Sequence, residues 1–134
     1  ASLGDVFGNL IEYNTSGGQS FLQYGCLAAL TRGEPFVEAL VARCGQAAEL
    51  VFQQLAALPR VKLARPAGAF YCFFRVEGID DSLAFAKQVL SETGVGLAPG
   101  SAFGAGGEGH LRLCFAGAPE RLVTALERIE HLLS

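Results

Sequence analysis

The stretch LAPGSAFGAGGEGHLRLCFA, residues 97–116, carries the strongest signals in this sequence. It holds five glycines between a proline and an apolar run, and that run contains one arginine, Arg112. A glycine-rich loop is typical of phosphate binding, whereas a lone arginine in an apolar strand needs an anionic partner. The stretch therefore leaves two interpretations, a nucleotide-binding loop or a carboxylate-binding site.

The glycine spacing matches the sequence motif of a dinucleotide-binding loop, but the secondary structure predicted around it does not. Gly104, Gly106 and Gly109 satisfy G-x-G-x-x-G, but the fingerprint needs a strand before the glycines and a helix after them. Alternating residues predict a strand after this loop instead. The glycines either turn a tight corner between two strands or let the backbone approach a ligand closely. Glu108 either orients the loop or is a solvated surface acid, and we expect the solvated acid.

Arg112 gives the sharper argument. Alternation places Leu111 and Leu113 on one face of the predicted strand and Arg112 on the other, beside His110 and Cys114. A planar guanidinium binds a carboxylate through two parallel hydrogen bonds. Its partner is either an acidic side chain of this chain or the carboxylate of a ligand.

Composition excludes several classes of protein. Apolar residues make up 51% of the 134 residues against 17% charged, which excludes a disordered chain. A net charge of −3 without a basic run predicts no nucleic-acid partner. No apolar run reaches the roughly 20 residues of a membrane span, and residues 1–10 do not look like a signal peptide. We therefore expect a cytoplasmic protein that binds neither nucleic acid nor membrane.

The four cysteines are far apart and have apolar neighbours. This pattern predicts small buried hydrophobic residues rather than disulfides, and it predicts no metal site.

Hydrophobic periodicity predicts three helices, followed by strand, strand, helix, strand, strand and helix. The expected ranges are helices over 3–13, 19–30, 35–58, 83–92 and 118–133, and strands over 60–65, 69–76, 95–99 and 110–116. This order predicts an α+β fold, in which a small, mostly antiparallel sheet has helices packed on one face and a long helix precedes it.

The combination of RPAGAFYCFFRV, GVGLAPGSAFGAGGEGHLRLCFA and ERLVTALERI resembles the C-terminal small domain of fold-type I, pyridoxal-phosphate-dependent aminotransferases of class I/II. The family's P-x-G-x-F-Y strand, V-x-x-x-P-G-x-x-F-G loop, L-R-x-x-x-A strand and final helix occur in that order over residues 65–132. Upstream, NTSGGQSFLQYGCLAAL resembles the segment that leads into the family's long interdomain helix. The resemblance implies an aspartate-aminotransferase-like small domain over 35–134 and an N-terminal helical segment, 1–34, that packs on a large domain.

By this resemblance, Arg112 matches the arginine that binds the α-carboxylate of the amino-acid substrate. Tyr71, Gly100, Phe103 and Gly104 match the entrance of the site. The resemblance implies pyridoxal 5′-phosphate as cofactor, an amino acid and a 2-oxo acid as substrates, amino transfer as the reaction, and a homodimer as the assembly.

The chain departs from the family pattern at the lysine that binds the cofactor. That lysine stands in an S-x-S-K-like motif, and neither Lys62 nor Lys87 has it. We therefore expect the C-terminal part of a longer aminotransferase, inactive alone, without a catalytic residue of its own and with unknown contacts to the cofactor. Two alternatives stay open: the ligand-binding aminotransferase-like domain of a regulator, and a related fold-type I lyase.

Overall fold

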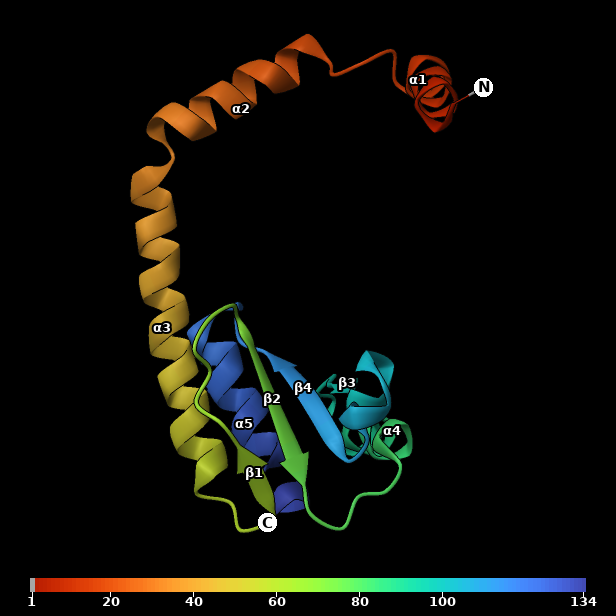
Figure 1. Cartoon of the computed structure of the whole chain (residues 1–134). Coiled ribbons are helices and arrows are strands. Elements are labelled where there is room, and N and C mark those ends of the chain that lie inside the picture. Colours follow the sequence, from red (N-terminus) through yellow and green to blue (C-terminus); the bar gives the residue numbers. More distant parts are fainter. Residues whose placement is uncertain (1) are drawn as a thin grey trace. The chain divides into compact units, whose positions relative to one another are not determined.

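The computed structural model describes residues 2–134 and has the predicted order of helices and strands (Figure 1). Two short 3₁₀ turns, η1 and η2, occupy the glycine loop between the last two strands. The elements are α1 (Leu3–Asn14), α2 (Ser20–Arg32), α3 (Glu34–Ala56), β1 (Val61–Leu63), β2 (Tyr71–Val76), α4 (Ser82–Thr93), β3 (Ala98–Pro99), η1 (Gly100–Phe103), η2 (Ala105–Gly107), β4 (His110–Cys114) and α5 (Pro119–Leu133).

The four strands form one antiparallel sheet in the order β1-β2-β4-β3. In the central pair, Cys72 lies opposite Leu113 and Phe73 lies opposite Arg112. Because side chains alternate along a strand, this register puts Cys72 and Leu113 on one face and Phe73 and Arg112 on the other. The α+β prediction with a small antiparallel sheet is confirmed.

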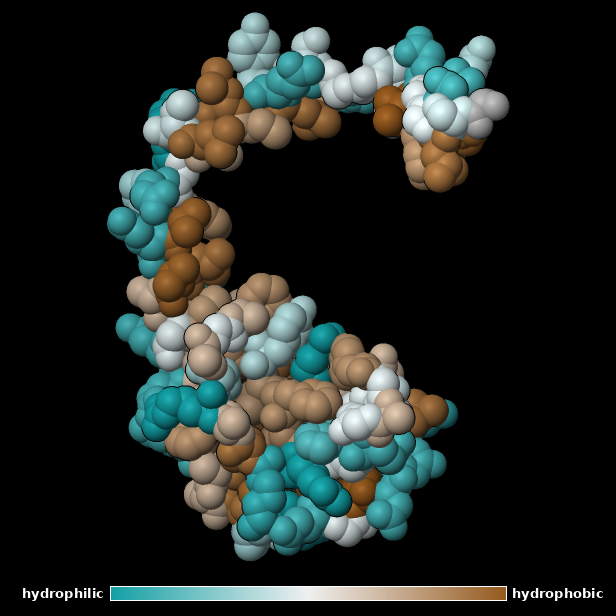
Figure 2. All heavy atoms as spheres, viewed as in Figure 1, coloured by the Kyte–Doolittle hydropathy of each residue, from teal (hydrophilic) through white to brown (hydrophobic). Residues whose placement is uncertain are grey.

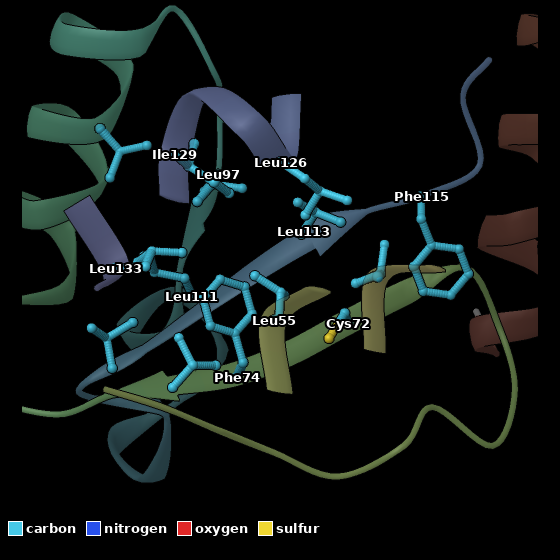
Figure 3. Close-up of a cluster of buried hydrophobic side chains, with 14 of the residues drawn as sticks. Leu55, Cys72, Phe74, Leu97, Leu111, Leu113, Phe115, Leu126, Ile129 and Leu133 are labelled. Carbon is cyan, nitrogen blue, oxygen red and sulfur yellow. The ribbon is translucent and has the colours of Figure 1, made fainter. Parts of the chain in front are cut away.

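The core lies between one face of this sheet and the helices α3, α4 and α5 (Figure 3). Its largest fully buried side chains come from strands and helices alike, and they include Phe74, Phe115, Leu55, Leu111, Ile129 and Leu133. Burying one such side chain contributes about 1.5–3 kcal/mol, so this face holds the sheet to its helices. The predicted packing of helices on one face is confirmed. The core helices do not cover the opposite face of the sheet.

Local signals in the sequence explain where α4 and α5 begin and end. Asp81 caps α4 by accepting a hydrogen bond from the Ala84 N–H at 2.8 Å, and Gly94 ends the helix in the left-handed conformation with φ 72°. Pro119 occupies the first turn of α5, where its missing N–H costs no hydrogen bond.

Contacts divide the chain into two units, residues 1–40 and 41–134. In the first unit, Ser2 and Asp5 form a capping box at the start of α1. No residue of α1 or α2 is buried, and Figure 2 shows apolar side chains gathered over these helices and the beginning of α3. Large apolar side chains that are 57% to 87% exposed include Leu3, Phe7, Leu10, Ile11, Phe21 and Leu30. The predicted boundary between residues 34 and 35 stays a prediction.

Across residues 2–134, no helix combines the length and the apolar character that a bilayer-spanning helix needs.

Candidate functional site

The face of the sheet opposite the core carries the side chains of the candidate site. Along β2, Tyr71 and Phe73 point to this face and are 37% and 41% exposed. Along β4, His110 and Arg112 point to the same face and are half-buried, as alternation predicted. Two adjacent strands thus present aromatic rings around one guanidinium.

The Arg112 guanidinium contacts two of these rings. Its Cζ lies 4.2 Å from the centroid of the Tyr71 ring and 4.0 Å from the centroid of the Phe103 ring. Both distances are well within the range of a cation–π interaction. The contacts bring together residues of β2, β4 and η1 that lie up to 41 positions apart in the sequence.

Arg112 has no ion-pair partner among residues 2–134, where the ion pairs are Lys62–Glu77 and Arg65–Glu49. Nor does its side chain donate a hydrogen bond to any described residue. The acidic side chain that the sequence left open as a partner is therefore not found in this part of the protein. The five N–H donors of the guanidinium suit a carboxylate that approaches in its plane.

A second layer of aromatic rings supports the first. The rings of Phe73 and His110 stack with centroids 4.9 Å apart and an interplanar angle of 5°. Phe73 also meets Phe103 edge to face, with centroids 6.0 Å apart. Sequence reasoning did not single out Phe73, although its alternation with Tyr71 in AFYCFFRV placed it on the same face.

The glycine loop is packed against itself. A Cβ on Gly100 would overlap the backbone oxygen of Gly107 and would lie 2.7 Å from that of His110. Gly104 has φ 108°, a conformation that residues with a side chain rarely adopt. A dinucleotide-binding site needs a helix directly after the glycines, but strand β4 follows this loop. The glycines instead allow a tight turn between β3 and β4.

Glu108 ties this loop to α4. Its carboxylate accepts hydrogen bonds from the N–H of Ser82 at 2.6 Å and from the N–H of Gly109 at 3.1 Å. These bonds, the one from Ser82 foremost, lower the pKa of Glu108. Of the two interpretations of Glu108, the favoured one, a merely solvated acid, is wrong, and the bonds support the other, an acid that orients the loop. A negative charge at a helix N-terminus satisfies free N–H groups.

Ser82 and Ser101 add a second tie between the loop and α4. The buried Ser82 hydroxyl accepts from the Ser101 N–H at 3.1 Å and donates to the Ser101 hydroxyl at 3.0 Å. Since Phe103 lies two residues beyond Ser101, these bonds fix the turn that presents the Phe103 ring to Arg112.

The cysteines form no part of this arrangement. Cys72 is buried, and burial raises the pKa of its thiol to about 11. Cys26 and Cys114 are exposed and Cys44 is half-buried, so the prediction of four buried cysteines is wrong for Cys26 and Cys114 and holds in full only for Cys72. Cys114 is exposed because it follows Arg112 by two residues and shares its face. The described residues contain no group of His, Cys, Asp and Glu side chains that suits a metal ion.

Comparisons with known proteins identify the fold. Residues 8–129 match the family "Aminotransferase class I and II". The chain is 37% identical over 126 residues to an aspartate aminotransferase of Pyrococcus abyssi, covering 90% of the chain and 32% of that relative. It is 36% identical over 126 residues to aromatic-amino-acid aminotransferase 2 of Thermococcus litoralis, with the same shares covered.

The crystal structure of an aromatic aminotransferase from Pyrococcus horikoshii superimposes with a TM-score of 0.85 at 35% identity, covering 93% of this chain and 34% of that one. The chain belongs to the class I and II aminotransferases, and the resemblance to the pyridoxal-phosphate-dependent fold-type I enzymes is confirmed. It spans about a third of the length of the relatives that it matches.

The family implies pyridoxal phosphate, which is held covalently through a lysine. Lys62 is exposed on β1 and pairs with Glu77 at 3.6 Å, and Lys87 is exposed on α4. The cation–π contacts among the described residues come from arginines, and neither lysine makes one with the rings around Arg112. The side chains present therefore fit a carboxylate and do not fit the covalent attachment of the cofactor.

Proposed function

We propose that these residues are the C-terminal part of a pyridoxal-phosphate-dependent aminotransferase, in which Arg112 binds the α-carboxylate of the substrate. The observation that carries the proposal is a half-buried guanidinium held by two rings, with no anionic partner among residues 2–134. Family membership supports the reaction, the transfer of an amino group between an amino acid and a 2-oxo acid.

One carboxylate site serves both halves of such a reaction. An amino acid and a 2-oxo acid both carry a carboxylate on the carbon that gives or receives nitrogen. Two parallel hydrogen bonds from Arg112 fix the distance and the rotation of that carbon relative to the sheet. We place the entrance of the site at Tyr71 and at the turn formed by Gly100, Phe103 and Gly104.

The remaining parts of the site belong to residues outside this chain. We propose that pyridoxal phosphate binds mainly to a large domain and that residues 1–34 pack on that domain. The protein would be a homodimer. The apolar side chains exposed along α1 and α2 support such packing, because a contiguous apolar surface of this kind is unfavourable in water.

The test is amino transfer by the full-length gene product that contains this chain. A ¹⁵N-labelled amino acid, an unlabelled 2-oxo acid and pyridoxal phosphate are incubated with the protein, and ¹⁵N is followed by NMR. We expect ¹⁵N in a new amino acid, and no transfer with residues 1–134 alone. Release of ammonia without transfer would indicate a lyase, and binding without turnover would indicate a regulator. Either result would contradict the proposal.

A further inference from the structure

We propose that Tyr71 and Phe103 are positioning residues for Arg112. Their rings hold the guanidinium in the orientation that receives the carboxylate, and they do not themselves bind the ligand. This inference rests on the proposed function of Arg112 and adds two residues to it.

Arginine needs such positioning because its side chain is long and flexible. An unrestrained arginine on an exposed sheet face samples many rotamers and loses that freedom when it binds a ligand. Here the Cζ of Arg112 lies 4.2 Å from one ring centroid and 4.0 Å from the other. Contacts with ring faces restrict the side chain before any ligand arrives and leave its in-plane N–H groups available.

The rings are themselves held in place. Tyr71 packs on Phe70 with centroids 4.6 Å apart, and Phe103 meets the edge of Phe73. The turn that carries Phe103 is fixed by the Ser101 N–H bond to Ser82. Because Phe70 braces Tyr71 and Phe73 braces Phe103, loss of one ring should loosen Arg112 while the other ring keeps its place.

The consequence is a preference for a charged carboxylate over a neutral amide of the same size. A fixed guanidinium delivers two charge-assisted hydrogen bonds to a carboxylate, and an amide can accept only at one oxygen and carries no charge. The ratio of the two dissociation constants therefore reports how well Arg112 is positioned.

The experiment measures Kd for butanoate and for butanamide by NMR titration of the full-length gene product. Neither probe carries an amino or oxo group on carbon 2, the carbon next to the carboxylate or amide, so neither takes part in amino transfer. We expect Phe103→Leu and Tyr71→Leu each to lower the preference for butanoate about 2- to 30-fold, the range that cation–π contacts span from exposed to desolvated sites. Tyr71→Phe keeps the ring and should keep the preference.

Two further variants control for shape and for general loss of cation–π contacts. Phe103→pentafluorophenylalanine keeps the ring's shape but reverses its quadrupole, so it should lower the preference even if Phe103→Leu fails to fold. Phe52→Leu removes a comparable contact elsewhere, where the Cζ of Arg65 lies 4.2 Å from the Phe52 centroid. It should leave the preference unchanged.

The outcomes separate this inference from the proposed function. If Arg112→Ala keeps the preference for butanoate, the carboxylate site itself is wrong. If Arg112→Ala abolishes the preference but the ring variants keep it, only the positioning role is overturned. In the Arg112→Ala background, Phe103→Leu should leave the remaining Kd for butanoate unchanged. A weaker Kd for butanoate in the double variant would mean that the ring contacts the ligand directly, which also overturns the inference.

Discussion

Arg112→Ala in the full-length gene product should weaken turnover of an amino acid while the cofactor stays bound. Arg112 is half-buried, and its guanidinium contacts the ring of Tyr71 on β2 and the ring of Phe103 on η1. It has no carboxylate partner among residues 2–134. If a substrate carboxylate binds here, it covers the part of the guanidinium that is still exposed, and the pair is then desolvated. Removing one partner of such a pair costs about 2–5 kcal/mol. At about 1.4 kcal/mol per tenfold, kcat/KM should fall roughly 30- to 4,000-fold.

The assay compares an amino acid with the amine that lacks its carboxylate. Wild-type protein should prefer the acid strongly, and Arg112→Ala should lose most of that preference because the amine never used the guanidinium. Arg112→Lys should recover part of the loss, since an ammonium supplies charge but not two parallel donors. Cofactor binding, followed by its absorbance, is the control for folding. Equal losses with acid and amine, or loss of the fold, would show that Arg112 stabilises structure and does not bind substrate.

Three further predictions concern the loop and the core. Glu108→Gln should lower the hydrogen-exchange protection of the Ser82 amide, whose N–H donates a hydrogen bond to the Glu108 carboxylate. Because folding lowers the pKa of Glu108, the difference between the variant and the wild type should be present above pH 4.5, the ordinary pKa, and should vanish as the pH falls through the lowered pKa. Glu127→Gln should leave this protection unchanged. Gly100→Ala should lower the free energy of unfolding, measured in urea, by about 1–3 kcal/mol, because the new Cβ overlaps backbone atoms. Gly106→Ala, whose new Cβ has no atom within 4 Å, should lower it by less than about 0.5 kcal/mol. Cys72, with its pKa raised to about 11, should react with iodoacetamide at pH about 8 only after denaturation, later than the two exposed cysteines.

The fold and the face of Arg112 could be predicted because both depend on local patterns. Alternation in HLRLC separates Leu111 and Leu113 from Arg112, and the structure buries the leucines and leaves the arginine on the other face. Helical spacing and caps placed the five helices within a few residues of their observed ends.

What the sequence left undecided depends on contacts between distant residues. Glu108 accepts from Ser82, 26 positions earlier, and nothing near Glu108 in the sequence indicates that bond. The close approach of Gly100 to Gly107 follows from two successive 3₁₀ turns, which glycine spacing alone does not specify. Apolar neighbours suggested a buried Cys114, but its alternation with Arg112 was the better guide.

A crystal structure of the full-length gene product with pyridoxal phosphate and a bound 2-oxo acid tests the central claim most directly. We predict that both carboxylate oxygens lie about 2.7–2.9 Å from guanidinium nitrogens of Arg112, which remains in contact with the Tyr71 and Phe103 rings. If Arg112 is instead paired with an acidic residue outside this chain while the carboxylate binds elsewhere, the account is contradicted.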